Sequence, residues 1–321
     1  MNCASLTKGD LAGLLALEDF SPVYAQADQI RQETVGNQVH IRAILEFSNY
    51  CKRGCLYCGL NRCNQKASRY RMAPEEILLT AKAAYKAGYQ TLVLQSGEDP
   101  YFIPELLAEL VKEIASWGMA VTVSCGEIPS VYGTLKKAGA SRYLLKHETA
   151  DPQLYNRLHP EGSLTERVAC LKQLKALGFE TGSGFMVGLP GQSLETLAED
   201  LLLLKELDCD MAGIGPFIPH PATPLKDAVP GSPELTKRCV ALARILLPHC
   251  HLPATTALGV MDGREKENIF SCGANVVMRK VTPEPYKSLY EIYPARLEPT
   301  NIPKDRALLE EQILSLGRIP V

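Results

Sequence analysis

A regular alternation of short β-type runs with longer helical patterns over residues 40–290 most constrains the fold of this chain. Repeated strand–helix units of this kind predict a parallel sheet. Eight of them in this length favour an α/β fold, a (β/α)8 barrel, over the alternative of an open doubly wound sheet. The runs predicted to be strands are residues 41–47, 91–95, 120–124, 142–147, 180–187, 211–217, 252–258 and 274–278.

Helix boundary signals separate the predicted strands. Ser163 and Glu166 have the spacing of a capping box at one helix start. Glycines, among them Gly88, stand where helices should end, a position at which glycine accepts left-handed backbone. No linker or low-complexity segment divides the chain. We expect an N-terminal helical extension over residues 1–35, the barrel over 36–296 and a C-terminal helical tail over 297–321.

The composition is that of a soluble globular protein, with 46% apolar and 22% charged residues. A net charge of −2 implies no general attraction to nucleic acid or acidic membranes. The start lacks the features of a signal peptide, and no apolar run reaches the length of a membrane span. The 11 cysteines are scattered and odd in number, which favours a reducing compartment. We therefore expect a cytoplasmic protein with neither nucleic acid nor membrane as a partner.

Three cysteines follow the first predicted strand. Cys51, Cys55 and Cys58 have the spacing C-x3-C-x2-C. Thiolates are soft ligands that suit iron–sulfur clusters and zinc, and purely structural sites of either kind usually have four protein ligands. Three thiolates on one centre therefore leave a metal position at which a small molecule can bind. The alternative is a zinc site completed by Cys63 or by a distant ligand.

Polar and glycine-rich residues also follow the next predicted strands. In a barrel, the loops after the strands meet at one end, and this end carries the chemistry. We therefore expect these loops to share one active face with the cysteines. They comprise residues 95–100, 124–127, 147–149 and 188–191.

The cysteine run, with an aromatic residue before its last cysteine, resembles the signature of the radical SAM superfamily. The resemblance implies that Cys51, Cys55 and Cys58 hold one [4Fe–4S] cluster. It also implies that the open iron of this cluster binds the amino and carboxylate groups of S-adenosylmethionine (SAM). An electron from the cluster then cleaves the sulfonium, releasing methionine and a 5′-deoxyadenosyl radical.

The same resemblance assigns cofactor contacts on the later loops. It implies that Glu98 meets the methionine amino group and that Glu148 binds the ribose hydroxyls. Arg167 matches an arginine that binds the methionine carboxylate, for which a fixed fork of donors is suited. The alternatives are a solvated turn for Glu98 and surface side chains for the other two. The remaining expected cofactor contacts are Tyr57, Met186 and Leu189 near the adenine, and Gln95 and Ser124 at the rim.

Longer stretches of the chain are similar to the HydE family of [FeFe]-hydrogenase maturases, from about residue 40 to 293. This resemblance implies radical attack on a sulfur of a cysteine-bound Fe(CO)2CN complex during assembly of the di-iron subcluster. It also implies partners: a tyrosine-lyase maturase that delivers the complex, a GTPase scaffold that receives the product, and a reductant such as ferredoxin or flavodoxin. The similar stretches include residues 45–49, 94–101, 143–149, 186–192, 213–221, 253–257 and 272–276.

Substrate contacts are expected at the far end of the strands. The expected substrate contacts are Gln95, His147, Thr255, Thr256, Arg279 and Tyr286.

The chain departs from the family pattern in two ways: it lacks a second cysteine triad near the C-terminus, and Lys146 stands where arginine is expected. The rival interpretations are a related enzyme, of the biotin synthase or methylornithine synthase type, and a non-catalytic iron–sulfur carrier.

Overall fold

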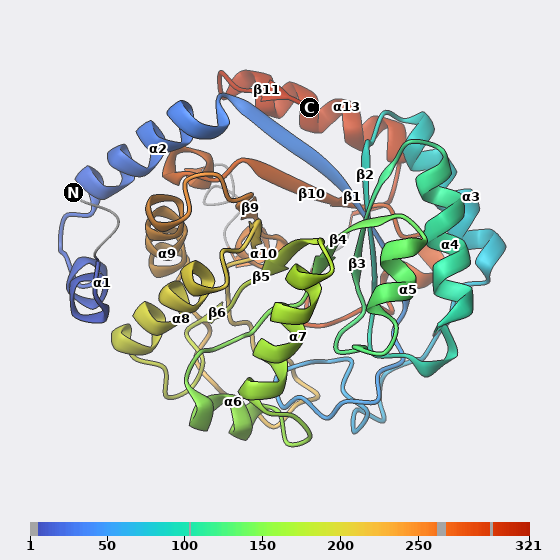
Figure 1. Cartoon of the computed structure of the whole chain (residues 1–321), viewed down its shortest axis with the longest axis horizontal. Helices are drawn as coiled ribbons and strands as arrows, with labels where there is room; N and C mark the ends of the chain where they lie inside the picture. The colour runs from blue at the N-terminus through green and yellow to red at the C-terminus, as the bar shows by residue number, and fades with distance from the viewer. Residues whose placement is uncertain (1–5, 103, 262–267, 296–297) are drawn as a thin grey trace.

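The computed structural model describes residues 6–102, 104–261, 268–295 and 298–321. Its main sheet is parallel throughout and runs in the order β7-β5-β4-β3-β2-β1-β10-β9. A parallel bridge between Met211 and His251 joins the two ends, so the sheet forms a nearly closed barrel (Figure 1). The predicted (β/α)8 fold is confirmed. The strands are β1 Gln38–Ser48, β2 Thr91–Ser96, β3 Ala120–Ser124, β4 Ala140–Leu144, β5 Glu180–Ser183, β7 Met211–Ala212, β9 Pro253–Ala254 and β10 Val276–Lys280.

Helices follow the strands and surround the sheet (Figure 1). Helix α4 shows why: it buries Leu107, Leu110, Val111 and Ile114, an apolar stripe at the helical period. None of the described helices is long and apolar enough to cross a bilayer. The helices of the barrel are α3 Pro74–Lys86, α4 Glu105–Ser116, α5 Tyr132–Lys137, α6 Pro152–Leu158, α7 Leu164–Ala176, α8 Leu194–Glu206, α9 Pro233–Leu246 and α10 Thr256–Met261.

Three predicted strands are shorter or interrupted. The run 180–187 divides into β5 and the two-residue β6, Met186–Val187, and the run 211–217 divides into β7 and β8, Gly215–Pro216. The prediction of a strand over 252–258 is wrong beyond residue 254, because helix α10 begins at Thr256. A short apolar run does not distinguish a strand from a buried helix segment.

Both chain ends lie on the outside of the barrel. Helices α1, Lys8–Leu15, and α2, Ser21–Val35, form the N-terminal extension and pack against α8 and α9. After α13, Ile302–Ser315, the short strand β11, Ile319–Pro320, pairs in parallel with the start of β1. The C-terminal segment is therefore not helical throughout. The expected boundary at residues 296–297 lies outside the described residues.

A buried arginine on α9 binds the segments that precede β9 and β10, at the end of the barrel opposite the cysteines. Arg244 is fully buried, and burial lowers its pKa to about 10. Its guanidinium donates to the Gly273 carbonyl at 2.9 Å and to Asn275 Oδ1 at 3.0 Å. Asn275 Oδ1 also accepts from the Leu252 amide at 2.9 Å. One amide oxygen thus satisfies two buried donors at the junction of β9 and β10.

We expect Asn275→Ala to lower the free energy of unfolding by about 3 kcal/mol, because it leaves a buried guanidinium N–H and a backbone N–H without an acceptor. Chemical denaturation of the variant measures this loss. The exposed Gln65→Ala variant is the control and should unfold at the same denaturant concentration as the parent. Equal stability of the two variants would contradict the proposed role of Asn275.

Candidate active site

Two adjoining cavities open at the carboxyl ends of the strands. The first, here called the cysteine cavity, has a volume of about 260 Å³ and is bordered by Cys51, Cys55 and Cys58. The second, the barrel cavity, has a volume of about 530 Å³. They share several wall residues, including Tyr57 and Glu148, so a molecule in one can reach a molecule in the other without leaving the protein.

Backbone contacts hold the cysteine loop against the loop that follows β2. The Lys52 amide donates to the Glu98 carbonyl at 3.1 Å. Gly97 permits this approach, since a Cβ there would lie 2.3 Å from the Tyr50 carbonyl oxygen and 2.7 Å from Cys51 Cβ. Arg69 braces the other side of the loop by donating to backbone carbonyls, among them that of Leu60 at 2.9 Å. The thiols therefore occupy a preformed wall.

Burial suppresses ionisation of all three thiols. It raises the pKa of Cys51, raises that of Cys55 to about 12, and raises that of Cys58 above its usual range. Bound iron would supply the positive charge that deprotonates them. Among the described residues, no three His, Cys, Asp or Glu side chains are arranged to hold a single ion. A [4Fe–4S] cluster fits this wall, because each thiolate then has its own iron.

Cys63 is not placed to be the fourth ligand of the zinc alternative. Cys63 is exposed and does not border the cysteine cavity. Its backbone amide donates to Asn61 Oδ1 at 2.9 Å.

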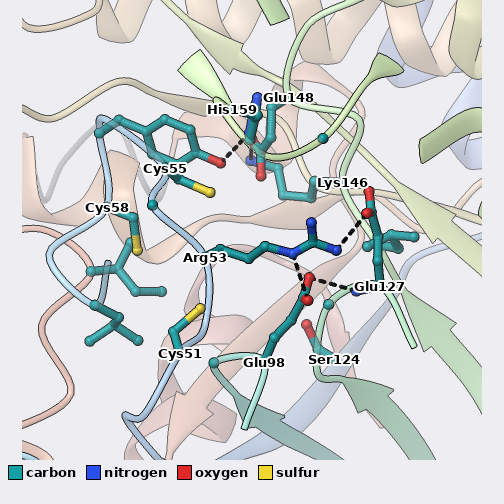
Figure 2. A pocket seen from close by; sticks show the side chains of 18 of the residues that line it. Cys51, Arg53, Cys55, Cys58, Glu98, Ser124, Glu127, Lys146, Glu148 and His159 are labelled. Carbon is teal, nitrogen blue, oxygen red and sulfur yellow. Dashed lines mark hydrogen bonds and ion pairs between the residues drawn. The ribbon is translucent and has the colours of Figure 1, made fainter. Parts of the chain in front are cut away.

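A charged network crosses the cavity floor. Arg53 reaches from the cysteine loop to Glu98, with Nε 2.7 Å from Oε2, and to Glu127, with Nη2 2.9 Å from Oε2 (Figure 2). Glu98 Oε1 accepts from the Glu127 amide at 2.8 Å. Arg167 binds Glu127 from the other side and donates through Nη1 to the Lys146 carbonyl at 2.5 Å. The loops after three strands are thus held together by alternating charges.

Glu148 has an unusual backbone. Its φ is +65°, and Asp208 is the only other described non-glycine residue with positive φ. Burial raises the pKa of its carboxyl, but Lys146, with Nζ at 3.0 Å, and Arg167 outweigh burial, so the pKa lies below the usual value. The carboxylate is therefore ionised at neutral pH and presents hydrogen-bond acceptors to both cavities.

An aromatic chain supports the cysteine loop. His159 Nδ1 lies 2.9 Å from the Tyr155 carbonyl, which only accepts, so Nδ1 carries the proton. Burial, with Arg167, lowers the pKa of His159 to about 4, so the ring is neutral. Its Nε2 then accepts from the Tyr57 hydroxyl at 3.0 Å. Tyr57 is the aromatic residue between the last two cysteines, and this bond orients it.

A buried ion pair stands in the wall of the barrel cavity. Lys280 Nζ lies 2.7 Å from Glu46 Oε1, and Glu46 is 2% exposed. Thr282 Oγ1 donates to Glu46 Oε2 at 3.3 Å. Thr255 Oγ1 is buried in the same wall without a hydrogen-bond partner. The cavity therefore offers a paired cation and anion and an unused hydroxyl.

Most of the site residues expected from sequence border one of the two cavities. Those at the cysteine cavity, besides the cysteines, are Tyr57, Gln95, Glu98, Ser124, Glu148 and Arg167. Those at the barrel cavity are Tyr57, Gln95, Glu148, Met186, Thr255, Thr256 and Arg279.

Three expected contacts border neither cavity. His147 is fully buried behind the wall, with Nδ1 3.0 Å from Ser183 Oγ. The structure does not bring it to the expected place at the rim, because its fully buried ring lies against Phe185. Leu189 packs in a small apolar cluster against which Tyr57 and Met186 lie, so it stands behind the cavity wall. Tyr286 stacks on Tyr70 and donates to Glu76 on α3.

Arg279 borders the barrel cavity, but its charged end points elsewhere. Its Nη2 pairs with Asp305 of α13 at 2.8 Å, on the outside of the sheet. Successive strand residues point to opposite faces, so the neighbouring Lys280 is the cation that faces inward.

Sequence reasoning missed several charged or titratable residues of the site: Arg53, His159, Glu46 and Lys280. Two of them carry a signal that could have found them. Arg53 lies inside the cysteine run, and Glu46 is an acid within an apolar strand, where burial requires a partner.

The comparisons with known proteins agree with this geometry. Residues 45–204 match the family model of the radical SAM superfamily. The [FeFe] hydrogenase maturase subunit HydE of Thermotoga maritima is 52% identical over 93% of this chain and 86% of its own length. The 3-methylornithine synthase of Methanosarcina acetivorans is 32% identical over 85% of this chain and 79% of its own. The crystal structure of methylornithine synthase (PylB) superposes with a TM-score of 0.86 at 27% identity, covering 99% of this chain and 94% of that one.

We expect Cys55→Ala to lose its iron after anaerobic reconstitution. Loss of a supporting group around a metal costs 10–100-fold in affinity, so loss of a ligand should cost at least about tenfold. Iron and sulfide content and the EPR spectrum of the reduced protein measure this. Cys63→Ala is the matched control and should retain full iron; iron loss there would revive the four-ligand zinc alternative.

Proposed function

The chain belongs to the radical SAM superfamily and, within it, to the HydE family of [FeFe]-hydrogenase maturases, and from this premise we propose the reaction of its site. It is an enzyme of hydrogenase active-site maturation. The proposed reaction is reductive cleavage of SAM to methionine and a 5′-deoxyadenosyl radical, which attacks a sulfur of a cysteine-bound Fe(CO)2CN substrate. The observation that supports it best is a wall of three free thiols beside two connected cavities.

Cys51, Cys55 and Cys58 would hold one [4Fe–4S] cluster, which supplies one electron to the sulfonium when bound. The three cysteines are only partly exposed in the wall of the cysteine cavity, which would limit the access of water to this transfer. A small electron-transfer protein, such as a ferredoxin or flavodoxin, is the proposed reductant.

The cysteine cavity suits SAM in charge and shape. Glu148, an ionised acceptor, is proposed for the ribose hydroxyls, and Arg167 for the methionine carboxylate. Glu98 is proposed for the amino group; it already accepts from Arg53, so SAM would share or replace that contact. Tyr57 and Met186 are proposed beside the adenine, with Leu189 packed behind them. Gln95 and Ser124 complete the rim.

The barrel cavity suits a charged substrate. Its volume, about 530 Å³, is about twice the 260 Å³ of the cysteine cavity. Lys280 and Lys146 offer positive charge to an anionic iron complex, and Thr255 offers a free hydroxyl. Gln95 and Glu148 border both cavities, so the radical forms next to the substrate and is shielded from solvent.

The proposed setting is the cytoplasm, where free cysteines persist. A tyrosine-lyase maturase would supply the iron complex, and a GTPase scaffold would receive the product. The second candidate activity is that of a methylornithine synthase, favoured by the likeness of the whole fold to that enzyme. Its identity to this chain is lower than that of HydE.

The test of the enzyme reaction is anaerobic reconstitution, reduction with dithionite and measurement of 5′-deoxyadenosine. We expect methionine and 5′-deoxyadenosine in equal amounts from the parent protein and neither from Cys55→Ala. Addition to an in vitro maturation mixture that lacks its own HydE should then restore hydrogenase activity. A fully loaded protein that cleaves no SAM with candidate substrates present would refute the enzyme assignment.

Variants of the buried pair Glu46–Lys280 separate substrate binding from SAM cleavage. Replacing both members of the buried pair, Glu46→Gln with Lys280→Met, leaves no unpaired buried charge. We expect the KM for the iron complex to rise by about tenfold or more, since a hydrogen bond to a charged group contributes about 1.5–3 kcal/mol. SAM cleavage without substrate should be unchanged. Arg279→Met tests the adjacent cation: a larger effect there would reassign the substrate contact from Lys280 to Arg279.

A further inference from the structure

Two segments of the cavity wall meet at Glu148, after β4, and Met186, on β6. Glu148 has left-handed backbone, which costs free energy in a non-glycine residue and persists only when its surroundings impose it. Met186, on β6, donates its amide to the Glu148 carbonyl at 3.1 Å. The Glu148 amide in turn donates to the Gly184 carbonyl at 2.9 Å. These backbone hydrogen bonds join the two segments. Side chains hold the residues that follow each of them, at Ala150 and at the turn after β6.

Gln192 organises the turn that follows β6. Its Oε1 accepts from the amides of Gly188 at 2.7 Å and Leu189 at 3.2 Å. Its Nε2 donates to the Met186 carbonyl at 2.9 Å and to Asp200 Oδ2 at 3.1 Å. All four hydrogen-bonding positions of one amide are therefore used. The turn depends on the amide being oriented with its oxygen toward the backbone.

Asp200, on α8, decides that orientation. A carboxylate only accepts, so the side of Gln192 that faces it must be the N–H side. The other carboxylate oxygen, Oδ1, accepts from the amide of Ala150, two residues after Glu148. The hydrogen bonds thus close a ring through Glu148, Met186, Gln192, Asp200 and Ala150. His147 Nε2 lies 3.7 Å from Oδ1, outside hydrogen-bond distance.

Burial disfavours the charged form of the Asp200 side chain. Its side chain is fully buried, and burial raises its pKa, opposed by His147 and by its hydrogen bonds with Ala150 and Gln192. It borders neither cavity, and its partners Ala150, Gln192 and His147 border neither cavity either. Its hydrogen bonds with Ala150 and Gln192 fix the segment after β4 and the turn after β6 relative to each other.

We propose that Asp200 is a positioning residue for SAM binding: through Ala150 and Gln192 it holds Glu148 and the turn at Met186–Leu189 in the arrangement that receives the nucleoside. This inference rests on the proposed function, because it takes the cysteine cavity as the site of SAM. It extends that proposal to a residue outside both cavities. The ring acts on binding and not on the electron transfer, since none of its members borders the thiols except Glu148.

The test is Asp200→Asn, which keeps the size of the side chain but sets an N–H against a donor of Gln192 or Ala150. In the reconstituted protein we expect the KM for SAM to rise about tenfold, the cost of about one unsatisfied buried hydrogen bond, with kcat for 5′-deoxyadenosine little changed. Hydrogen–deuterium exchange should accelerate at the amides of residues 148–150 and 186–192. Gln192→Ala should reproduce both effects, and the double variant should not exceed the larger single effect.

Leu201→Ala is the matched control, since Leu201 neighbours Asp200 on α8 and is equally buried but faces the apolar core. It should lower the thermal midpoint without changing the KM for SAM or exchange in the two wall segments. Unchanged KM and exchange in Asp200→Asn would overturn the proposal, as would an equal KM shift in Leu201→Ala. If the parent binds no SAM, the proposed function fails, and exchange still decides whether Asp200 holds the two segments.

Discussion

Parallel pairing of the strands into a nearly closed barrel is the constraint on which the site depends. Because every strand runs in the same direction, the loops after β1, β2, β3 and β4 emerge at one end and face one another. Residues distant in sequence therefore converge on one cavity, with Cys51 on the first loop and Glu148 on the fourth. The bridge between Met211 and His251 joins the two ends of the sheet.

Charge compensation then allows this enclosed space to be polar. Glu98, Glu127, Glu148 and Glu46 are largely buried, and each contacts a lysine or arginine. For Glu98, Glu127 and Glu46 this cation comes from another loop or strand, whereas Glu148 pairs with Lys146 of its own loop. A buried charge without a partner is expensive, so these pairs also hold the loops in register. At the thiols, burial outweighs the nearby Arg53 and Arg167 and raises the pKa values, so bound iron would supply the compensating positive charge.

Prediction from sequence succeeded where the signal was local. Strand–helix alternation located every strand of the barrel, and the capping box of Ser163 and Glu166 is present at the start of α7. It could not decide between two possible side-chain directions. Arg279 and Lys280 are adjacent cations, and only the pleat of β10 decides that Lys280 faces inward. His147 was expected at the rim because the end of β4 cannot be located from its apolar run.

The sequence by itself determined the fold class, the cysteine spacing and the family, because each is written in residue order and in short-range periodicity. Only the tertiary structure decided which charges meet. The ring through Asp200 joins residues fifty positions apart by a hydrogen bond from the Ala150 amide. The left-handed backbone of Glu148 is likewise imposed by its neighbours in space. Such contacts depend on the distance between atoms of packed elements, and no local pattern in the chain encodes that distance.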